Sequence, residues 1–239
     1  MHLDLSPRTP RDRLIVALDV TTPAEARLIM ARLGETVIFY KIGMQLVFGG
    51  GLSLIPELTA AGKRVFLDMK LLDIDNTVGG AVAGIAQLGA TFTTIHAYPR
   101  AMRAAVAARG AAGLGLLGVT VLTSMDDGDL SAAGYRDSAG QLVAARAADA
   151  LAAGMDGLVC SPLEAAAVRK RVGPDLMIVT PGIRPAGPAG DDQRRVATAT
   201  EALQAGADYL VVGRPITTAV DPASVAASII REIEKREFA

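Results

Sequence analysis

The sequence predicts an α/β protein with a single domain, a closed (β/α)8 TIM barrel over residues 1–239. Eight short apolar runs alternate with alanine-rich segments of helical character. Nearly continuous apolar strands joined by single helices are typical of a parallel sheet that helices cover on its outside. Eight such units in 239 residues match the size of one closed barrel, and no linker rich in proline or serine divides the chain.

The boundaries of the elements follow from capping and turn residues. Thr22-Pro23 pairs a helix-capping residue with a proline in the first turn, and Gly34 follows the end of the same helical segment. In chain order, the expected strands are residues 14–18, 37–42, 65–67, 92–95, 114–122, 157–160, 176–180 and 209–212. The expected helices are residues 23–33, 52–61, 78–88, 100–109, 139–153, 162–172, 194–205 and 221–236.

The composition narrows the partners and the location. The chain has 24 Lys and Arg against 25 Asp and Glu, so no basic excess points to nucleic acid or to an anionic membrane. No apolar run is long enough to span a bilayer, and no signal peptide is visible. Cys160 is the only cysteine, which excludes an intrachain disulfide and fits a reducing compartment. We expect a cytoplasmic protein that binds neither nucleic acid nor membrane.

A barrel of this kind carries its functional groups at the carboxyl ends of its strands. Polar or charged residues follow nearly every predicted strand at that end. In chain order, they are Asp19, Lys41, Asp68 with Lys70, His96, Thr123 with Ser124, Ser161, Arg184, and Gly213 with Arg214. Each of them alone is most simply a surface residue, but their recurrence at one end of the barrel predicts a site there.

The third predicted strand runs into the pattern Asp68-x-Lys70-x-x-Asp73. Side chains two residues apart on a strand share a face, so Asp68 and Lys70 point the same way. In isolation, such a pattern is more often a salt-bridge cluster that caps a strand. Here two carboxylates flank a lysine at the functional end of a barrel, and opposite charges nearby favour the protonated lysine. The pattern therefore predicts that Lys70 holds a proton within a negative field.

Two motifs after the seventh and eighth strands predict a phosphate site, because barrels commonly bind phosphate at this position. They are Thr180-Pro181-Gly182-Ile183-Arg184 and Val212-Gly213-Arg214-Pro215-Ile216. Gly213 allows the backbone to approach an anion, and the guanidinium groups of Arg184 and Arg214 suit phosphate oxygens. A loop over residues 185–192, followed by Gln193, lies after the first motif, and such loops often close over ligands.

The segment after the fifth strand begins with Thr123 and Ser124, whose hydroxyl groups suit either a planar heterocycle or local turns. His96 has no histidine or carboxylate partners at the spacing of metal ligands, and His2 is the only other histidine. We therefore expect no histidine-rich metal site, and we interpret His96 as packing beside the site.

Six motifs in this order resemble those of orotidine 5′-phosphate decarboxylases, over residues 15–216. They are Val16-Ala17-Leu18-Asp19, Lys41-Ile42-Gly43, Asp68-Met69-Lys70-Leu71-Leu72-Asp73-Ile74, Val119-Thr120-Val121-Leu122-Thr123-Ser124 and the two phosphate motifs. The resemblance implies loss of CO₂ from C6 of the orotate ring, which gives uridine 5′-phosphate in the last step of de novo UMP synthesis. It implies no metal and no organic cofactor.

The resemblance also implies roles for the residues of the site. Lys70 stabilises the carbanion and donates the proton, within an alternating charge network that also contains Lys41, Asp68 and Asp73. Asp73 comes from the second subunit of a homodimer with shared active sites. The substrate-binding residues are Asp19 and Lys41 for the ribose, Thr123 and Ser124 for the pyrimidine, Arg184, Gln193, Gly213 and Arg214 for the phosphate, Pro181, and Ile74 and Thr77 beside Asp73.

Two other functions stay open. A metal-dependent sugar-phosphate enzyme similar to 3-hexulose-6-phosphate synthase shares the Asp-x-Lys-x-x-Asp pattern, but it needs an additional acidic ligand and lacks the Thr-Ser pattern. A non-catalytic barrel that binds a phosphorylated ligand accounts for the arginines, but it has no need for the costly charge cluster around Lys70. A decarboxylation assay with and without a chelator separates the three functions.

Overall fold

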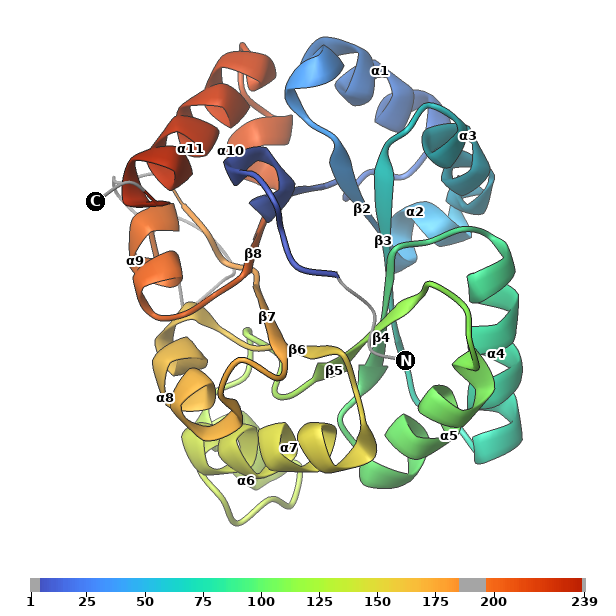
Figure 1. Cartoon of the computed structure of the whole chain (residues 1–239), viewed down its shortest axis with the longest axis vertical. Coiled ribbons are helices and arrows are strands. Elements are labelled where there is room, and N and C mark those ends of the chain that lie inside the picture. The colour runs from blue at the N-terminus through green and yellow to red at the C-terminus, as the bar shows by residue number, and fades with distance from the viewer. Residues whose placement is uncertain (1–4, 185–196, 238–239) are drawn as a thin grey trace.

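The computed structural model describes residues 5–184 and 197–237, and they form a closed barrel of eight parallel strands. The strands follow one another around the barrel in chain order, and β1 (Leu14–Ala17) pairs with β8 (Tyr209–Val212) to close it. The helices surround the strands on the outside (Figure 1). The predicted (β/α)8 TIM barrel is thus confirmed.

All eight predicted strands are present, although some ends differ from the prediction. The other six are β2 (Phe39–Gly43), β3 (Arg64–Leu71), β4 (Phe92–His96), β5 (Gly115–Val119), β6 (Gly157–Val159) and β7 (Met177–Thr180). β3 continues past its expected end at Leu67, because Asp68 still pairs with Gly43 of β2 and Leu71 pairs with Ile95 of β4. β5 ends earlier than expected, since β6 pairs with it only as far as Val159.

The helices also follow the predicted order. They are α1 (Pro23–Leu33), α2 (Met44–Phe48), α3 (Leu54–Ala60), α4 (Asp75–Gln87), α5 (Pro99–Arg109), α6 (Asp127–Ala132), α7 (Ala139–Ala153), α8 (Pro162–Val172), α9 (Ala199–Gln204), α10 (Arg214–Thr217) and α11 (Pro222–Glu237), with 3-10 turns at Pro10–Arg13, Gly34–Thr36 and Gly51–Ser53. None of the described helices is long and apolar enough to cross a membrane.

Three helices, α1, α7 and α8, have the predicted bounds, because each begins with a capping box and ends at a glycine. The sequence analysis missed α2 and α6, which are too short to show helical periodicity. A signal for α6 was present, since Asp126 and Asp129 form a capping box at its start. Of the expected helix 194–205, α9 forms the later part, and residues 194–196 lie outside the described residues.

Two apolar layers hold the barrel together. Successive side chains of a strand point to opposite faces, so Ile15 packs inside the barrel while Val16 packs outward against the helices. Four aromatic residues, Phe39, Phe66, Phe92 and Tyr209, dominate the interior layer. Burying one such side chain contributes about 1.5–3 kcal/mol to folding. The interior layer forms the floor on which the functional end of the barrel is built.

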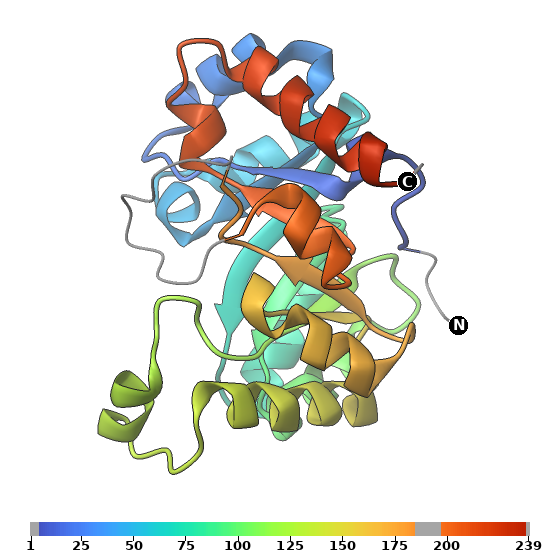
Figure 2. The ribbon, with the colours of Figure 1, turned by 90° about the vertical axis from the view of Figure 1, so that its left-hand side faces the viewer.

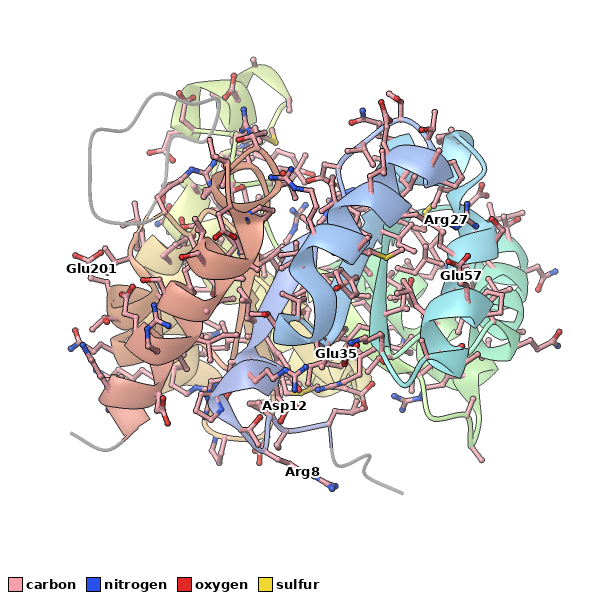
Figure 3. The ribbon with its side chains drawn as sticks, turned by 90° about the horizontal axis from the view of Figure 1, so that it is seen from above. Arg8, Asp12, Arg27, Glu35, Glu57 and Glu201 are labelled. Atoms are coloured by element: carbon pink, nitrogen blue, oxygen red, sulfur yellow. The ribbon has the colours of Figure 1, made fainter. Side chains whose placement is uncertain are left out.

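Charged pairs on the outside of the barrel contribute less to the free energy of folding than the apolar layers do. Figure 3 shows Arg27 of α1 and Glu57 of α3 pointing toward one another, and Nη2 of Arg27 lies 2.7 Å from Oε2 of Glu57. Both side chains are about half exposed, at 49% and 46%, so water screens their attraction. This ion pair joins two helices on the outside of the barrel and does not position the residues of the functional end.

Candidate active site

A cavity of about 490 Å³ opens at the carboxyl ends of the strands. Its apolar walls include Phe66 and Val211 from the interior of the barrel. The lining residues with polar side chains are Asp19, Lys41, Gln45, Asp68, Lys70, Thr123, Arg184 and Arg214. A concave apolar pocket with a few converging polar groups is the usual form of a small-molecule site.

Four of these side chains form a line of alternating charge across β1, β2 and β3. Nζ of Lys41 donates a hydrogen bond to Oδ1 of Asp19 at 2.7 Å and lies 3.7 Å from Oδ2 of Asp68. Nζ of Lys70 donates to the same Oδ2 of Asp68 at 2.8 Å. The structure therefore joins four residues that the sequence singled out on three separate strands.

The two central members of this line, Lys41 and Asp68, are buried, with side chains only 11% and 12% exposed. Burial by itself lowers the pKa of Lys41, but the charges of Asp68 and Asp19 outweigh it and hold that pKa above its usual value. Burial by itself raises the pKa of Asp68, but Lys41 and Lys70 outweigh it and hold that pKa below its usual value. Both groups are therefore charged at neutral pH.

The backbone at Lys70 is bent away from regular strand geometry. Its φ is +50°, and no other non-glycine residue in the described part of the chain has a positive φ. The register between β3 and β4 shifts here, since Leu67 pairs with Thr93 and Leu71 with Ile95. A bulge of this kind re-aims a side chain at the rim of a barrel, and here it turns Lys70 toward Asp68.

The hydroxyl group of Thr94 on β4 completes this arrangement. Oγ1 of Thr94 donates to Oδ1 of Asp68 at 2.8 Å and accepts the backbone N–H of Lys70 at 2.9 Å. The sequence analysis did not identify Thr94. A signal was present, because a strand of buried apolar residues contains two adjacent threonines, Thr93 and Thr94.

The predicted phosphate residues that the structure describes lie on the β7–β8 side of the cavity. Arg184 follows β7, Arg214 begins α10, and both line the cavity together with Pro181 and Gly213. Gly182 also lines it and has a φ of +82°, a conformation that favours glycine. Two guanidinium groups thus face the same cavity as the charge line. Gln193 lies outside the described residues.

The predicted hydroxyl pair is divided by the structure. Thr123 lines the cavity, whereas Ser124 is exposed and is not among the lining residues. Both belong to the segment that leads to α6, which stands away from the body of the barrel (Figure 2). Gln45, in the first turn of α2, lines the cavity and was missed by the sequence analysis. Its signal was a polar residue shortly after the end of a strand.

The segment from Asp73 to Thr77 does not reach the cavity of its own chain. Asp73, Ile74 and Thr77 are all exposed, and none of them lines the cavity. The carboxylate of Asp73 accepts the N–H of Ile74, its own neighbour, at 2.6 Å. The exposed fraction of Ile74 is 72% and that of Leu72 is 51%. The third member of the Asp68-x-Lys70-x-x-Asp73 pattern therefore stands outside the charge line in this chain.

His96 ends β4 and does not line the cavity. Burial, together with the positive charges of Arg146 and Lys70, lowers its pKa, so the imidazole is neutral at physiological pH. Within residues 5–184 and 197–237, no three histidine, cysteine or carboxylate side chains are grouped as a metal ion requires.

A second cavity, of about 740 Å³, lies around the amino ends of the strands and is larger than the first. Its central arginine is used by the fold, since Arg169 donates to the carbonyl groups of Gly173, Leu176 and Gly206. In barrels of this kind, the amino ends of the strands serve stability and the carboxyl ends carry the functional groups. The smaller cavity is therefore the candidate active site.

Comparisons with known proteins identify the relatives of this chain. The family model described as "Orotidine 5'-phosphate decarboxylase / HUMPS family" matches residues 12–229. A curated relative from Rhodopseudomonas palustris (strain BisB5), named orotidine 5'-phosphate decarboxylase, is 58% identical over 93% of this chain and 95% of its own length. A relative of the same name from Afipia carboxidovorans is 58% identical over 95% of this chain and 97% of its own length.

Two solved structures have a similar fold. The crystal structure of orotidine 5'-phosphate decarboxylase from Lactobacillus acidophilus has a TM-score of 0.81 and 37% sequence identity, covering 92% of this chain and 98% of that one. The crystal structure of an uncharacterized conserved protein from Geobacillus kaustophilus has a TM-score of 0.80 and 34% identity, covering 92% of this chain and 99% of that one.

Proposed function

This chain belongs to the orotidine 5'-phosphate decarboxylase / HUMPS family, and we propose that it decarboxylates orotidine 5′-phosphate with Lys70 as the proton donor. The product is uridine 5′-phosphate, which makes the reaction the last step of de novo UMP synthesis. The observation that carries the proposal is the ammonium group of Lys70, which faces the cavity and is held by Asp68 at 2.8 Å.

The chemical step needs an electrostatic partner for the carbon that loses CO₂. When the C6–carboxylate bond breaks, its electron pair stays on C6 of the ring and CO₂ leaves. The ammonium group of Lys70 stabilises this developing charge and then transfers one proton to C6, which leaves Lys70 as a neutral amine. Solvent returns the proton after the product leaves. Asp68 keeps the ammonium group in place, and Lys41 on the other side balances the charge of Asp68.

The rest of the cavity suits the other parts of the nucleotide. Asp19 and Lys41, which hydrogen-bond to one another, are proposed to hold the ribose hydroxyls. Thr123 and Ser124 are proposed to contact the pyrimidine. The phosphate is assigned to Arg184, Gln193, Gly213 and Arg214, and Pro181 is also proposed to bind the substrate. Because the phosphate is distant from C6, its binding free energy orders the charged site without taking part in the chemistry.

We also propose that the enzyme is a homodimer in which each subunit completes the active site of the other. Asp73, Ile74 and Thr77 are exposed and do not line their own cavity. Ile74 and Leu72, in the same segment, are large apolar residues that are exposed, and exposed apolar patches are typical of an interface. A two-fold dimer carries this segment into the neighbouring cavity twice, by symmetry.

The chain is further proposed to act as one catalytic domain in the cytoplasm. β1 pairs with β8, so residues near both ends of the chain belong to the same barrel. The single cysteine, Cys160, is buried and forms no disulfide, which suits a reducing compartment. Cell fractionation that recovers the enzyme outside the cytoplasm would overturn the location.

The activity is tested by following the absorbance change of orotidine 5′-phosphate in the presence of the purified protein. We expect turnover that excess EDTA leaves unchanged, because the proposed step uses only side chains. Loss of activity with EDTA and its return with Mg²⁺ would overturn the metal-free step. No turnover of orotidine 5′-phosphate, together with Mg²⁺-dependent turnover of a sugar phosphate, would favour a metal-dependent sugar-phosphate enzyme. Binding of uridine 5′-phosphate without any turnover would favour a non-catalytic phosphate-binding barrel.

The shared active site is tested by mixing two inactive variants, Lys70→Ala and Asp73→Asn, under conditions of subunit exchange. In a mixed dimer, one site combines both defects and the other site is intact. Random exchange therefore restores about one site in four, as two-fold symmetry requires. If mass spectrometry confirms exchange and activity stays at the level of the parents, Asp73 acts within its own chain.

A further inference from the structure

The bulge in β3 leaves three residues facing one. Between the pairs Leu67–Thr93 and Leu71–Ile95, residues 68–70 of β3 lie opposite the single residue Thr94 of β4. Regular ladder pairing is interrupted over this stretch, which contains Asp68 and Lys70. A buried backbone N–H that loses its ladder partner needs another acceptor. The N–H of Lys70 finds it in the side chain of Thr94, at 2.9 Å.

The single hydroxyl group of Thr94 has its direction fixed by its two neighbours. A hydroxyl group has one hydrogen to donate and can accept at the same time. Oγ1 accepts from the backbone of Lys70, so its own hydrogen goes to Oδ1 of Asp68, at 2.8 Å. The other oxygen of Asp68, Oδ2, is then left for Nζ of Lys70. One buried hydroxyl group thus holds both the backbone of Lys70 and the carboxylate that orients its ammonium group.

This contact acts on a conformation that a lysine seldom adopts. The φ of +50° at Lys70 lies in the left-handed region, where a side chain with a Cβ is disfavoured. Such residues persist at functional sites when their surroundings hold them. Thr94 is fully buried and does not line the cavity, so it reaches a substrate only through Asp68 and Lys70.

We propose that Thr94 is a positioning residue for the decarboxylation, whose hydroxyl group aligns the ammonium group of Lys70 with the reacting carbon. The proposal rests on the proposed function, because it assigns Thr94 a role in the proton transfer by Lys70. A small displacement of a catalytic group lowers turnover strongly, even when substrate binding is kept. The effect of losing the hydroxyl group therefore falls on kcat and not on KM.

The neighbouring residue provides a matched control. Thr93 is also fully buried on β4, and its Oγ1 donates to the carbonyl oxygen of Leu67 at 2.9 Å. It therefore has the same side chain and the same burial as Thr94 and also donates one hydrogen bond to β3, but that hydrogen bond goes to Leu67 and not to Asp68. A general loss of strand pairing would appear in both variants, whereas a loss of alignment would appear only at Thr94.

The experiment compares Thr94→Val, Thr94→Ser and Thr93→Val by kcat, KM and the urea midpoint of unfolding. We expect Thr94→Val to lower kcat by about tenfold to a hundredfold while KM changes by less than about threefold. Thr94→Ser, which keeps the hydroxyl group, should retain a kcat close to that of the wild type. Thr93→Val should keep its kcat, whatever it does to stability.

Equal losses of kcat in Thr94→Val and Thr93→Val would overturn the proposal, as would a Thr94→Ser variant no more active than Thr94→Val. If Thr94→Val does not fold, Thr94→Ala compared with Thr94→Ser answers the same question, since only the serine restores the hydroxyl group. The wild type is assayed first with orotidine 5′-phosphate. Its failure to turn over would refute the proposed function, whereas an active wild type with unaffected variants would refute only the role of Thr94.

Discussion

The two ends of the barrel use charged side chains in opposite ways. At the amino end, where the strands begin, the guanidinium group of Arg64 lies 4.3 Å from the centre of the Phe39 ring and donates to Oη of Tyr209 at 3.1 Å. Asp12 faces the same arginine at 3.7 Å, and Leu5 packs against the interior layer. Figure 1 shows the N-terminal segment crossing this end of the barrel. The charge of Arg64 is thus surrounded by groups of its own chain.

At the carboxyl end, charged groups are left facing an open cavity. Lys70 has one carboxylate at 2.8 Å and an exposed side-chain fraction of 28%, and Arg184 and Arg214 face the same space. The same strand, β3, begins with Arg64 and ends near Lys70. Arg64, at the start of the strand, packs against residues of the barrel interior, whereas Lys70, near its end, is available to a substrate. The difference separates stability from chemistry along one strand, and the substitutions below test that separation.

The largest effect is expected for Lys70→Ala. It removes the proposed proton donor, so turnover should fall by many orders of magnitude. Because Lys70 belongs to a coupled charge network, this loss also includes the effect of disturbing its neighbours. Binding of uridine 5′-phosphate, measured by calorimetry, should persist. Lys63 is the matched control, because it precedes the same strand at the amino end and pairs with Glu35 at 2.8 Å. Substantial decarboxylation by Lys70→Ala, or an equal loss in Lys63→Ala, would contradict the separation.

Phe92→Ala should show the reverse pattern. The ring is fully buried and lies 5.3 Å from that of Tyr209 and 5.4 Å from that of Phe39. Removing such a ring costs about 3–5 kcal/mol of unfolding free energy. Urea denaturation measures this loss, and the kcat of the folded fraction should stay close to that of the wild type. A variant of unchanged stability but reduced kcat would show that the interior layer also serves the chemistry.

Asp68→Asn should affect both properties, because Asp68 is buried between two lysines. Removing one member of a buried ion pair costs about 3–5 kcal/mol at neutral pH. The pKa of Asp68 is lower in the folded state than its usual value of 3.8. The carboxylate therefore stabilises the fold fully at pH values above 3.8, and this stabilisation is lost as the pH falls through the lower pKa of the folded state. The stability difference between wild type and Asp68→Asn, measured in urea from pH 7 to pH 3, should therefore shrink below pH 3.8. A difference that stays constant over this range would show that the charge of Asp68 does not stabilise the fold.

Arg214→Ala is expected to have the smallest effect of the four. A charge-assisted contact contributes roughly 1.5–3 kcal/mol, so kcat/KM for orotidine 5′-phosphate should fall by about tenfold or more. A substrate truncated at the phosphate provides the control, since it makes no contact with this guanidinium group. Equal losses for both substrates would show that Arg214 supports the structure of α10 and not the phosphate.

The sequence by itself was sufficient for the barrel and for most of the polar groups around its cavity. The order of strands and helices follows from the alternation of apolar runs with helical segments, and each of these is recognised from neighbouring residues in the sequence. The closing of the barrel then places every strand end on one rim. Asp19, Lys41, Lys70 and Arg214 were therefore predictable as members of one site from their positions after apolar runs.

Only the tertiary structure decided how these groups meet. The bulge opposite Thr94 depends on the register of two strands, and no local pattern in either strand specifies it. The residues alone also did not place Asp73 outside its own cavity, because its spacing from Lys70 is the same whether the chain turns inward or outward; only the resemblance to a family implied that position. Local residue types determine which charges a strand carries, whereas pairing between strands determines where those charges point.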